Sequence, residues 1–171
     1  RALSDGDQIL GVIRGSAMGQ DGGSHSVHGA LLSGLEEAVA RTLAVSGVDA
    51  SEVSYLDGQG AGKPEWDHAE LRALSRAYTK KATETPLSCG FGSVGPNVGH
   101  GHPVSGMASL LKVLLGFQDG DLVPSIHWDG RAPQSPAWAF DETPFFPVSK
   151  RCRWEKVQGT RIAGISAFGL G

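Results

Sequence analysis

The chain has 171 residues, of which 40% are hydrophobic, which is enough for one domain with a sizeable core. Its net charge is −3, and no basic run is flanked by aromatic residues, which argues against nucleic-acid binding. No apolar run is long enough to span a membrane, and we expect no signal peptide.

Strands and helices are predicted in alternation along the first half of the chain. Residues 8–15 (QILGVIRG) alternate apolar and β-branched side chains, which predicts a strand. Residues 30–46 place apolar side chains at helical spacing and predict an amphipathic helix that ends at Gly47. A strand is predicted at 53–56, and Asp67 is expected to cap a helix that runs to about residue 80.

The second half continues the alternation around a long apolar segment. Residues 88–92 are small and predict a buried strand, and residues 103–117 predict a helix without a polar face, which must be buried on every side. Residues 122–128 are expected to be extended, 129–147 to form a Pro-rich crossing, and 161–168 to form a final buried strand. This order predicts a layered α/β domain.

Candidate functional residues lie in the loops where the predicted strands end, since ligand sites gather there in α/β folds. His100 follows a Gly/Pro/Asn turn, although a histidine in such a turn is more often structural. His25 and His28 have no carboxylate or thiol companions, so we expect no metal site there. The two cysteines, Cys89 and Cys152, lack metal-type spacing and indicate free thiols in a reducing, cytoplasmic setting.

Four segments carry motifs in a recognisable order. They are residues 13–22 (IRGSAMGQDG), 57–63 (DGQGAGK), 92–100 (GSVGPNVGH) and 165–171 (ISAFGLG). Together they resemble the C-terminal half of a β-ketoacyl synthase (ketosynthase) domain of the modular polyketide or multienzyme fatty-acid type. The last three segments align with the family motifs Glu-Ala-His-Gly-Thr-Gly-Thr, Gly-Ser-Val-Lys-Ser-Asn-Ile-Gly-His and Ser-Ser-Phe-Gly-Phe-Gly-Gly.

The resemblance covers essentially the whole chain and implies a thiolase-like layered α/β fold with a mixed sheet and a buried central helix. Residues 1–171 would form the C-terminal half of the domain. The family's nucleophilic cysteine belongs to the N-terminal half, and neither Cys89 nor Cys152 matches it. Implied partners are that half, an acyl carrier protein with its phosphopantetheine arm, and a second ketosynthase in a homodimer or heterodimer. No other cofactor is expected. Alone, this half would leave its central helix uncovered and would aggregate.

The resemblance also implies a catalytic set, in which two histidines donate hydrogen bonds to the thioester oxygen that becomes negative during decarboxylation. The second of these is His100, accompanied by Asn97, whereas Gln59 replaces the first. An amide can donate a hydrogen bond but cannot shuttle a proton near neutral pH. The lysine that precedes the second histidine in the family is Gly95 here.

Substrate-binding positions are altered as well. The two threonines that contact the pantetheine arm in the family correspond to Ala61 and Lys63. In the last motif Phe168 is retained, and Leu170 replaces the phenylalanine that gates the cysteine. The backbone N–H of the family's oxyanion hole would survive at this position, so acyl-thioester handling would be preserved better than decarboxylation.

These departures predict a non-elongating ketosynthase in polyketide or fatty-acid biosynthesis, which transfers an acyl chain without decarboxylative condensation. Whether the chain belongs to an active enzyme is left open. One alternative is a non-catalytic partner of an active ketosynthase, similar to a chain-length factor. The other is an active condensing enzyme that uses Gln59 in place of the histidine.

Overall fold

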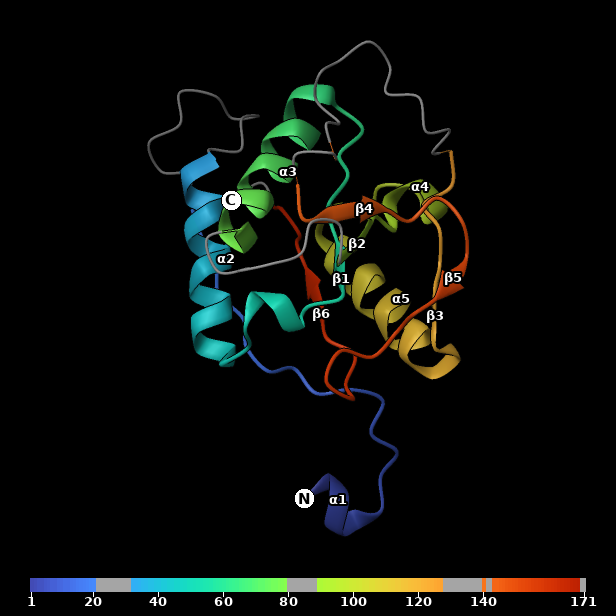
Figure 1. Cartoon of the computed structure of the whole chain (residues 1–171). Coiled ribbons are helices and arrows are strands. Elements are labelled where there is room, and N and C mark those ends of the chain that lie inside the picture. The colour runs from blue at the N-terminus through green and yellow to red at the C-terminus, as the bar shows by residue number, and fades with distance from the viewer. Residues whose placement is uncertain (21–31, 80–88, 128–139, 141–142, 170–171) are drawn as a thin grey trace.

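A four-stranded parallel sheet forms the centre of the computed structural model, which describes residues 1–20, 32–79, 89–127, 140 and 143–169 (Figure 1). The strand order is β4-β2-β1-β6. Its strands are β1 (Tyr55–Asp57), β2 (Cys89–Gly92), β4 (Phe145–Pro147) and β6 (Ala163–Ile165). A separate antiparallel ribbon pairs β3 (Asp121–Leu122) with β5 (Cys152–Arg153).

Helices cover both faces of the sheet, which confirms the layered α/β class (Figure 1). Helices α2 (Leu32–Ser46) and α3 (Pro64–Thr79) pack together on one face, and α5 (Ser105–Asp119) lies on the other. The shorter elements are α1 (Ala2–Asp5), α4 (Gly95–Val98) and the 3₁₀ turns Ala50–Glu52 and His102–Val104.

Side-chain alternation along β1 divides the core into two clusters. Leu56 packs into the cluster shared with α2 and α3, whereas Tyr55 packs into the cluster shared with α5. In the second cluster Trp154 is 2% exposed, and its indole N–H donates to Ser54 Oγ at 2.8 Å. Each layer therefore has its own apolar core, and burial of each large apolar side chain contributes about 1.5–3 kcal/mol.

The predicted strand at 8–15 is wrong, because this segment has no strand structure and pairs with no strand in the described part of the chain. Gly11 instead lies against Leu114 of α5, while Val12 and Ile13 are 74% and 76% exposed. An isolated extended segment has no partner for its backbone N–H and C=O groups, so its β-type sequence alone does not make a strand. The expected crossing at 129–147 contains β4 in its described part.

Helix α5 is not buried on every side. Its Val113 is 4% exposed, but the opposite face carries an apolar stripe that is 58–59% exposed. The stripe consists of Val104, in the 3₁₀ turn that precedes the helix, and Met107, Leu111 and Leu115. The sheet covers one side of the helix only, and these residues recur every three or four positions on the other. Strand β6, predicted to be buried, is a half-exposed edge strand.

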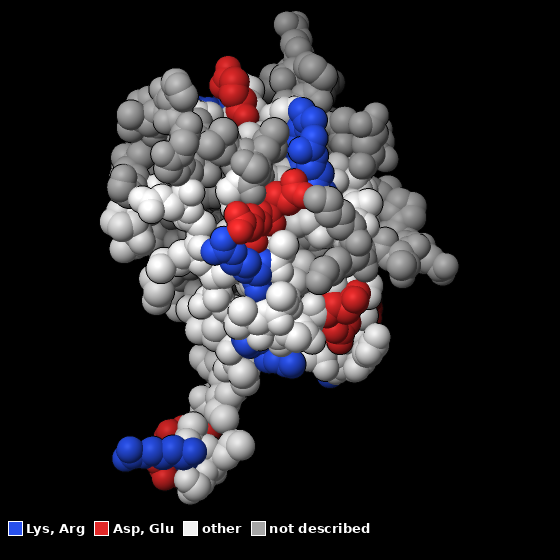
Figure 2. All heavy atoms as spheres, turned by 90° about the vertical axis from the view of Figure 1, so that its left-hand side faces the viewer, with Lys and Arg blue, Asp and Glu red and all other residues white. Residues whose placement is uncertain are grey.

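The predicted helix at 30–46 is confirmed by α2 over its described residues, and Gly47 follows it with a φ of 63°. Helix α3 begins at Pro64, so Asp67 lies within its first turn and is not its N-cap. No helix of the described residues is both long and apolar enough to cross a bilayer. On the face shown in Figure 2, charges of both signs form small separate groups.

Candidate functional site

Three loops meet at the edge of the sheet where its parallel strands end. The loop after β1 carries Gln59, the loop after β2 leads to His100, and the segment after β6 carries Phe168. Parallel strands bring their carboxyl ends to the same edge, so segments that are distant in sequence become neighbours. The candidate site therefore combines residues separated by as many as 109 positions.

Gln59 and His100 lie side by side at this edge. Gln59 Nε2 is 3.4 Å from His100 Nδ1, at the long limit of a hydrogen bond. Gln59 is 7% exposed, whereas His100 is exposed. His100 also contacts His102, with the two rings edge to face and 4.6 Å between their centroids. The structure thus brings together the two residues that the sequence singles out.

The oxygen of the Gln59 amide is held from a third loop. The backbone N–H of Phe168 donates to Gln59 Oε1 at 3.2 Å, and Ser105 Oγ lies 3.3 Å from the same oxygen. The Ser105 hydroxyl has one hydrogen, and the carbonyl of His102 is the nearer acceptor at 2.9 Å. The Phe168 N–H is therefore the donor that fixes the amide.

Glycines allow the first two loops to approach each other. Gly60 has a φ of 56°, and a Cβ atom built there would lie 2.6 Å from Ser93 Oγ. Gly99 has a φ of 86° and comes directly before His100. Residues with side chains rarely adopt such angles, so glycine at these two positions permits the tight geometry.

A buried carboxylate of α3 anchors the Gln59 loop. The backbone N–H groups of Gln59 and Gly60 donate to the two carboxylate oxygens of Glu70, at 2.8 and 3.2 Å. Asp67 similarly accepts from the N–H groups of Ala61 and Gly62. Burial raises the pKa of Glu70 to about 7, although these hydrogen bonds oppose the shift. Asp67, expected to cap the helix, and Glu70 thus both fix the loop through hydrogen bonds from its backbone N–H groups.

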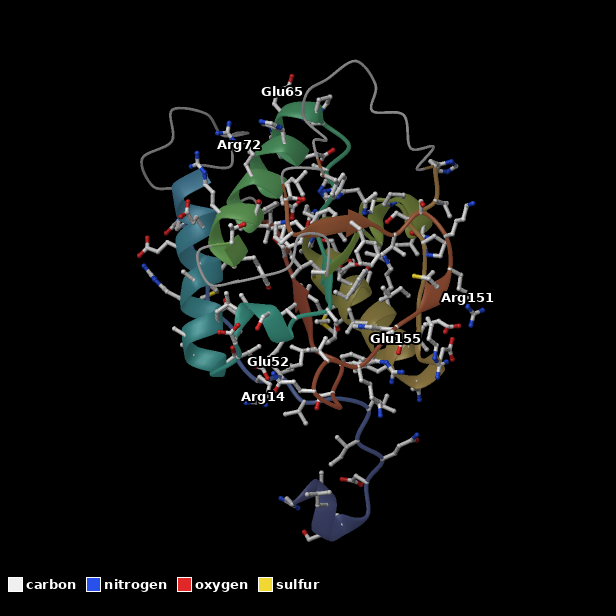
Figure 3. All side chains as sticks on the ribbon, viewed as in Figure 1. Arg14, Glu52, Glu65, Arg72, Arg151 and Glu155 are labelled. Atoms are coloured by element: carbon white, nitrogen blue, oxygen red, sulfur yellow. The ribbon has the colours of Figure 1, made fainter. Side chains whose placement is uncertain are left out.

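An ion pair lies beneath the site. Lys112 of α5 places its ammonium 2.8 Å from Asp57 Oδ2, and the Tyr55 hydroxyl donates to the same oxygen at 2.7 Å. Asp57 Oδ1 accepts the N–H of Val94, at the start of the loop that leads to His100. Burial, and then the Asp57 charge, raise the pKa of Tyr55, so the phenol stays a neutral donor. By contrast, charged side chains such as Glu65 and Arg151 project from the periphery in Figure 3.

The other predicted site residues take different places. The Asn97 side chain donates to the carbonyl of Pro124 at 3.2 Å, so it ties the loop to the β3 region. Ala61 offers its backbone N–H to Asp67. The Lys63 ammonium lies 4.7 Å from the centroid of the Trp66 ring. Leu170, His25 and His28 lie outside the described residues.

Neither cysteine has the surroundings of a nucleophile. Cys89 is 3% exposed in β2, and burial raises the pKa of its thiol. Cys152 is exposed, but partial desolvation and the Asp121 charge raise its pKa as well. Reactive cysteines need a lowered pKa, so Cys89 is a core-packing residue rather than a nucleophile. In the described part of the chain, no cluster of three or more acidic, histidine or cysteine residues could hold a metal.

Sequence reasoning missed three contributors to the site, namely Ser105, Lys112 and the anchoring role of Glu70. Lys112 left a signal, since it is a charged residue within an otherwise apolar helix segment and must therefore find a partner. The contact of Ser105 with Gln59 left none, because it depends on how α5 meets the loop after β1.

The sheet, its helices and the loops that meet at its edge define an α/β fold of the thiolase-like class, shared with solved ketosynthases. The ketosynthase from module 6 of the bacillaene synthase from Bacillus subtilis 168 has a TM-score of 0.91 and 29% identity, covering 99% of this chain and 30% of that chain. The Streptomyces albus oxazolomycin ketosynthase domain has a TM-score of 0.90 and 32% identity, covering 99% and 29%.

The beta-ketoacyl synthase, C-terminal domain family matches residues 10–129, and the chain belongs to this family. It is 36% identical over 171 residues to a phenolphthiocerol/phthiocerol polyketide synthase of Mycobacterium tuberculosis, covering 99% of this chain and 11% of that protein. It is 35% identical to the polyketide synthase ThaG of Burkholderia thailandensis, covering 99% and 3%. The chain thus spans about a tenth or less of these curated relatives.

Proposed function

We propose that this chain forms the C-terminal half of a non-elongating ketosynthase domain, which transfers acyl groups in polyketide or fatty-acid biosynthesis without decarboxylative condensation. The observation that carries the proposal is the contact between Gln59 and His100, 3.4 Å apart at the strand-end site. A pair of imidazoles is expected at these positions in the family, and an amide takes the place of one of them.

The chemical consequence differs between the two stages of ketosynthase catalysis. Acyl transfer needs a thiol and hydrogen-bond donors near the thioester carbonyl, and His100 and backbone N–H groups supply such donors. Decarboxylation also needs a second donor or proton carrier, and an amide does not titrate near neutral pH. Loss of a positioned acid/base group typically lowers the rate about 10²–10⁴-fold.

The transfer step requires a thiol from outside this chain, since Cys89 is buried and Cys152 lies on β5, apart from the strand-end loops. The acyl carbon leaves the sulfur of the carrier protein's phosphopantetheine arm and bonds to the cysteine sulfur. The proton of the cysteine thiol ends on the released carrier thiol, so no oxidant or further cofactor is consumed. Transfer to the next carrier protein reverses these steps.

The source of the thiol that we propose is an upstream half of the same domain. The apolar stripe on α5 supports this arrangement, because four side chains that are 58–59% exposed need a covering element. The chain matches only about 30% of each ketosynthase structure, which leaves room for such a half. Pairing with a second ketosynthase belongs to the same proposal.

The test uses the natural polypeptide that contains this chain. It is incubated with acyl carrier protein loaded with a labelled acyl group, and separately with malonyl carrier protein. We expect the acyl label to appear on the polypeptide, while carbon dioxide release stays at the background rate. In a Gln59→His variant, carbon dioxide release should rise above that background, whereas Gln158→His, in the exposed turn between Val157 and Thr160, should leave it unchanged.

Two results would overturn the proposal. Carbon dioxide release at a rate comparable to acyl transfer would identify an active condensing enzyme. Absence of any acyl uptake by the natural polypeptide would instead identify a non-catalytic partner of the chain-length-factor kind. Because the two assays use different loaded carriers, one outcome does not mask the other.

A further inference from the structure

The orientation of the Gln59 amide follows from its contact with a backbone N–H group, which can act only as a hydrogen-bond donor. The backbone N–H of Phe168 lies 3.2 Å from the outer end of the Gln59 side chain, and a backbone N–H can only donate. The atom that faces it must therefore be the carbonyl oxygen Oε1. The NH₂ group is then turned toward His100, whose Nδ1 lies 3.4 Å from Nε2.

An amide NH₂ group is a donor only, so the ring nitrogen that it meets must be an acceptor. We infer that Gln59 is a positioning residue that keeps Nδ1 of His100 unprotonated and so fixes the tautomer with its hydrogen on Nε2. This is a role that a histidine at position 59 would not dictate, because an imidazole can present either a donor or an acceptor nitrogen.

The surroundings of the ring favour a fixed orientation. The Nδ1 edge of His100 contacts a side chain that is only 7% exposed. His102 packs edge to face against the ring, with 4.6 Å between centroids, and restricts its rotation. The contacts thus hold the Nδ1 edge of the ring against the protein.

The fixed tautomer assigns a chemical role to His100. An Nε2–H group can donate a hydrogen bond to a thioester carbonyl oxygen, but in this state it cannot accept a proton at the same atom. His100 then acts on the substrate as a donor. The identity of the substrate in this step rests on the proposed function, whereas the tautomer itself is a property of the protein without substrate.

The test is NMR of the natural polypeptide labelled with ¹⁵N-histidine, recorded without substrate. Two-bond ¹H–¹⁵N correlations distinguish the tautomers, and the His100 signals are assigned by their loss in His100→Asn. We expect the Nε2–H pattern in the unmodified protein. In Gln59→Glu the introduced carboxylate can only accept, so the pattern should switch to Nδ1–H. Gln59→Met, which has no amide, should give a mixture of both tautomers.

The control is Gln158→Glu, the same change in the exposed turn between Val157 and Thr160, which should leave the His100 pattern unchanged. An Nδ1–H pattern in the unmodified protein would overturn the inference, and so would an unchanged pattern in Gln59→Glu. Failure of acyl transfer with the expected tautomer would refute the proposed function and leave this inference standing. Acyl transfer by a protein with the Nδ1–H tautomer would refute this inference and leave the proposed function standing.

Discussion

Asp57 is fully buried, and its carboxylate depends on the Lys112 ammonium 2.8 Å away. Removal of one partner from a buried ion pair leaves an uncompensated charge, which typically costs about 3–5 kcal/mol. We therefore predict that Lys112→Met lowers the free energy of unfolding of the domain by about this amount. Urea denaturation of the complete domain, unmodified and with Lys112→Met, is monitored by tryptophan fluorescence and measures the difference in the free energy of unfolding.

The double variant Lys112→Met/Asp57→Asn separates lost charge pairing from lost packing. We expect it to regain a substantial part of the stability, because no buried charge remains without a partner. Lys150→Met, on the exposed surface, serves as the control and should change the free energy of unfolding by less than about 0.5 kcal/mol. Equal stabilities of Lys112→Met and the unmodified protein would contradict the ion-pair argument.

Glu70 predicts a dependence of stability on pH. Burial raises its pKa from 4.5 to about 7, so between these values the folded state holds more protons than the unfolded state. The free energy of unfolding must then fall as pH rises through this range. The pKa difference corresponds to a contribution of about 3 kcal/mol to the free energy of unfolding. This contribution is fully present below about pH 4.5 and is lost as the pH rises through about 7. We expect Glu70→Gln to flatten this slope, as measured by denaturation at a series of pH values from 5 to 8.

Glu65→Gln provides the matched control, since Glu65 is an exposed carboxylate on the same helix. For Glu65→Gln, the free energy of unfolding plotted against pH should run parallel to that of the unmodified protein. If the curve of Glu70→Gln also ran parallel to it, the Glu70 carboxylate would not be titrating in the folded state in this range.

Among the helices and strands, two kinds are predictable from the sequence. They are helices, which satisfy their own backbone hydrogen bonds, and strands that lie in the centre of the sheet. The helix at α2 and the small-residue strand β2 follow from periodicity and glycine content. The segment 8–15 and β6 carry similar β-type sequences, yet the first has no strand partner among the described residues and the second is a half-exposed edge strand. Strand identity depends on neighbours that a local pattern does not contain.

The candidate site was likewise predictable only in part. Gln59 and His100 are predictable as neighbours, because both follow parallel strands within recognisable motifs, and the structure places them in contact. The polarity of that contact was not predictable, since the donor that orients the Gln59 amide comes from Phe168 on a third loop. The role of Glu70 as a loop anchor likewise required the packing of α3 against that loop.

For the molecule as a whole, the uncovered apolar stripe on α5 dominates the expected behaviour of the chain in solution. Leu111 and Leu115 are each 58% exposed on adjacent turns, and such a continuous patch promotes association. We predict that the chain expressed alone forms large aggregates and that Leu111→Gln/Leu115→Gln shifts it toward monomer. Light scattering at matched concentrations measures the change. Val45→Gln, which alters an isolated apolar residue that is 68% exposed on α2, should leave the aggregation unchanged.

The same double substitution should have the opposite consequence in the natural polypeptide, where we propose that an upstream half covers the stripe. Burial of a leucine side chain contributes about 1.5–3 kcal/mol, so the loss of two would lower the stability of the complete domain severalfold more than the Val45→Gln control. Thermal unfolding of the three polypeptides measures this. A melting temperature unaffected by the double substitution would show that the stripe stays exposed in the complete domain, and the proposed covering half would then have to dock elsewhere.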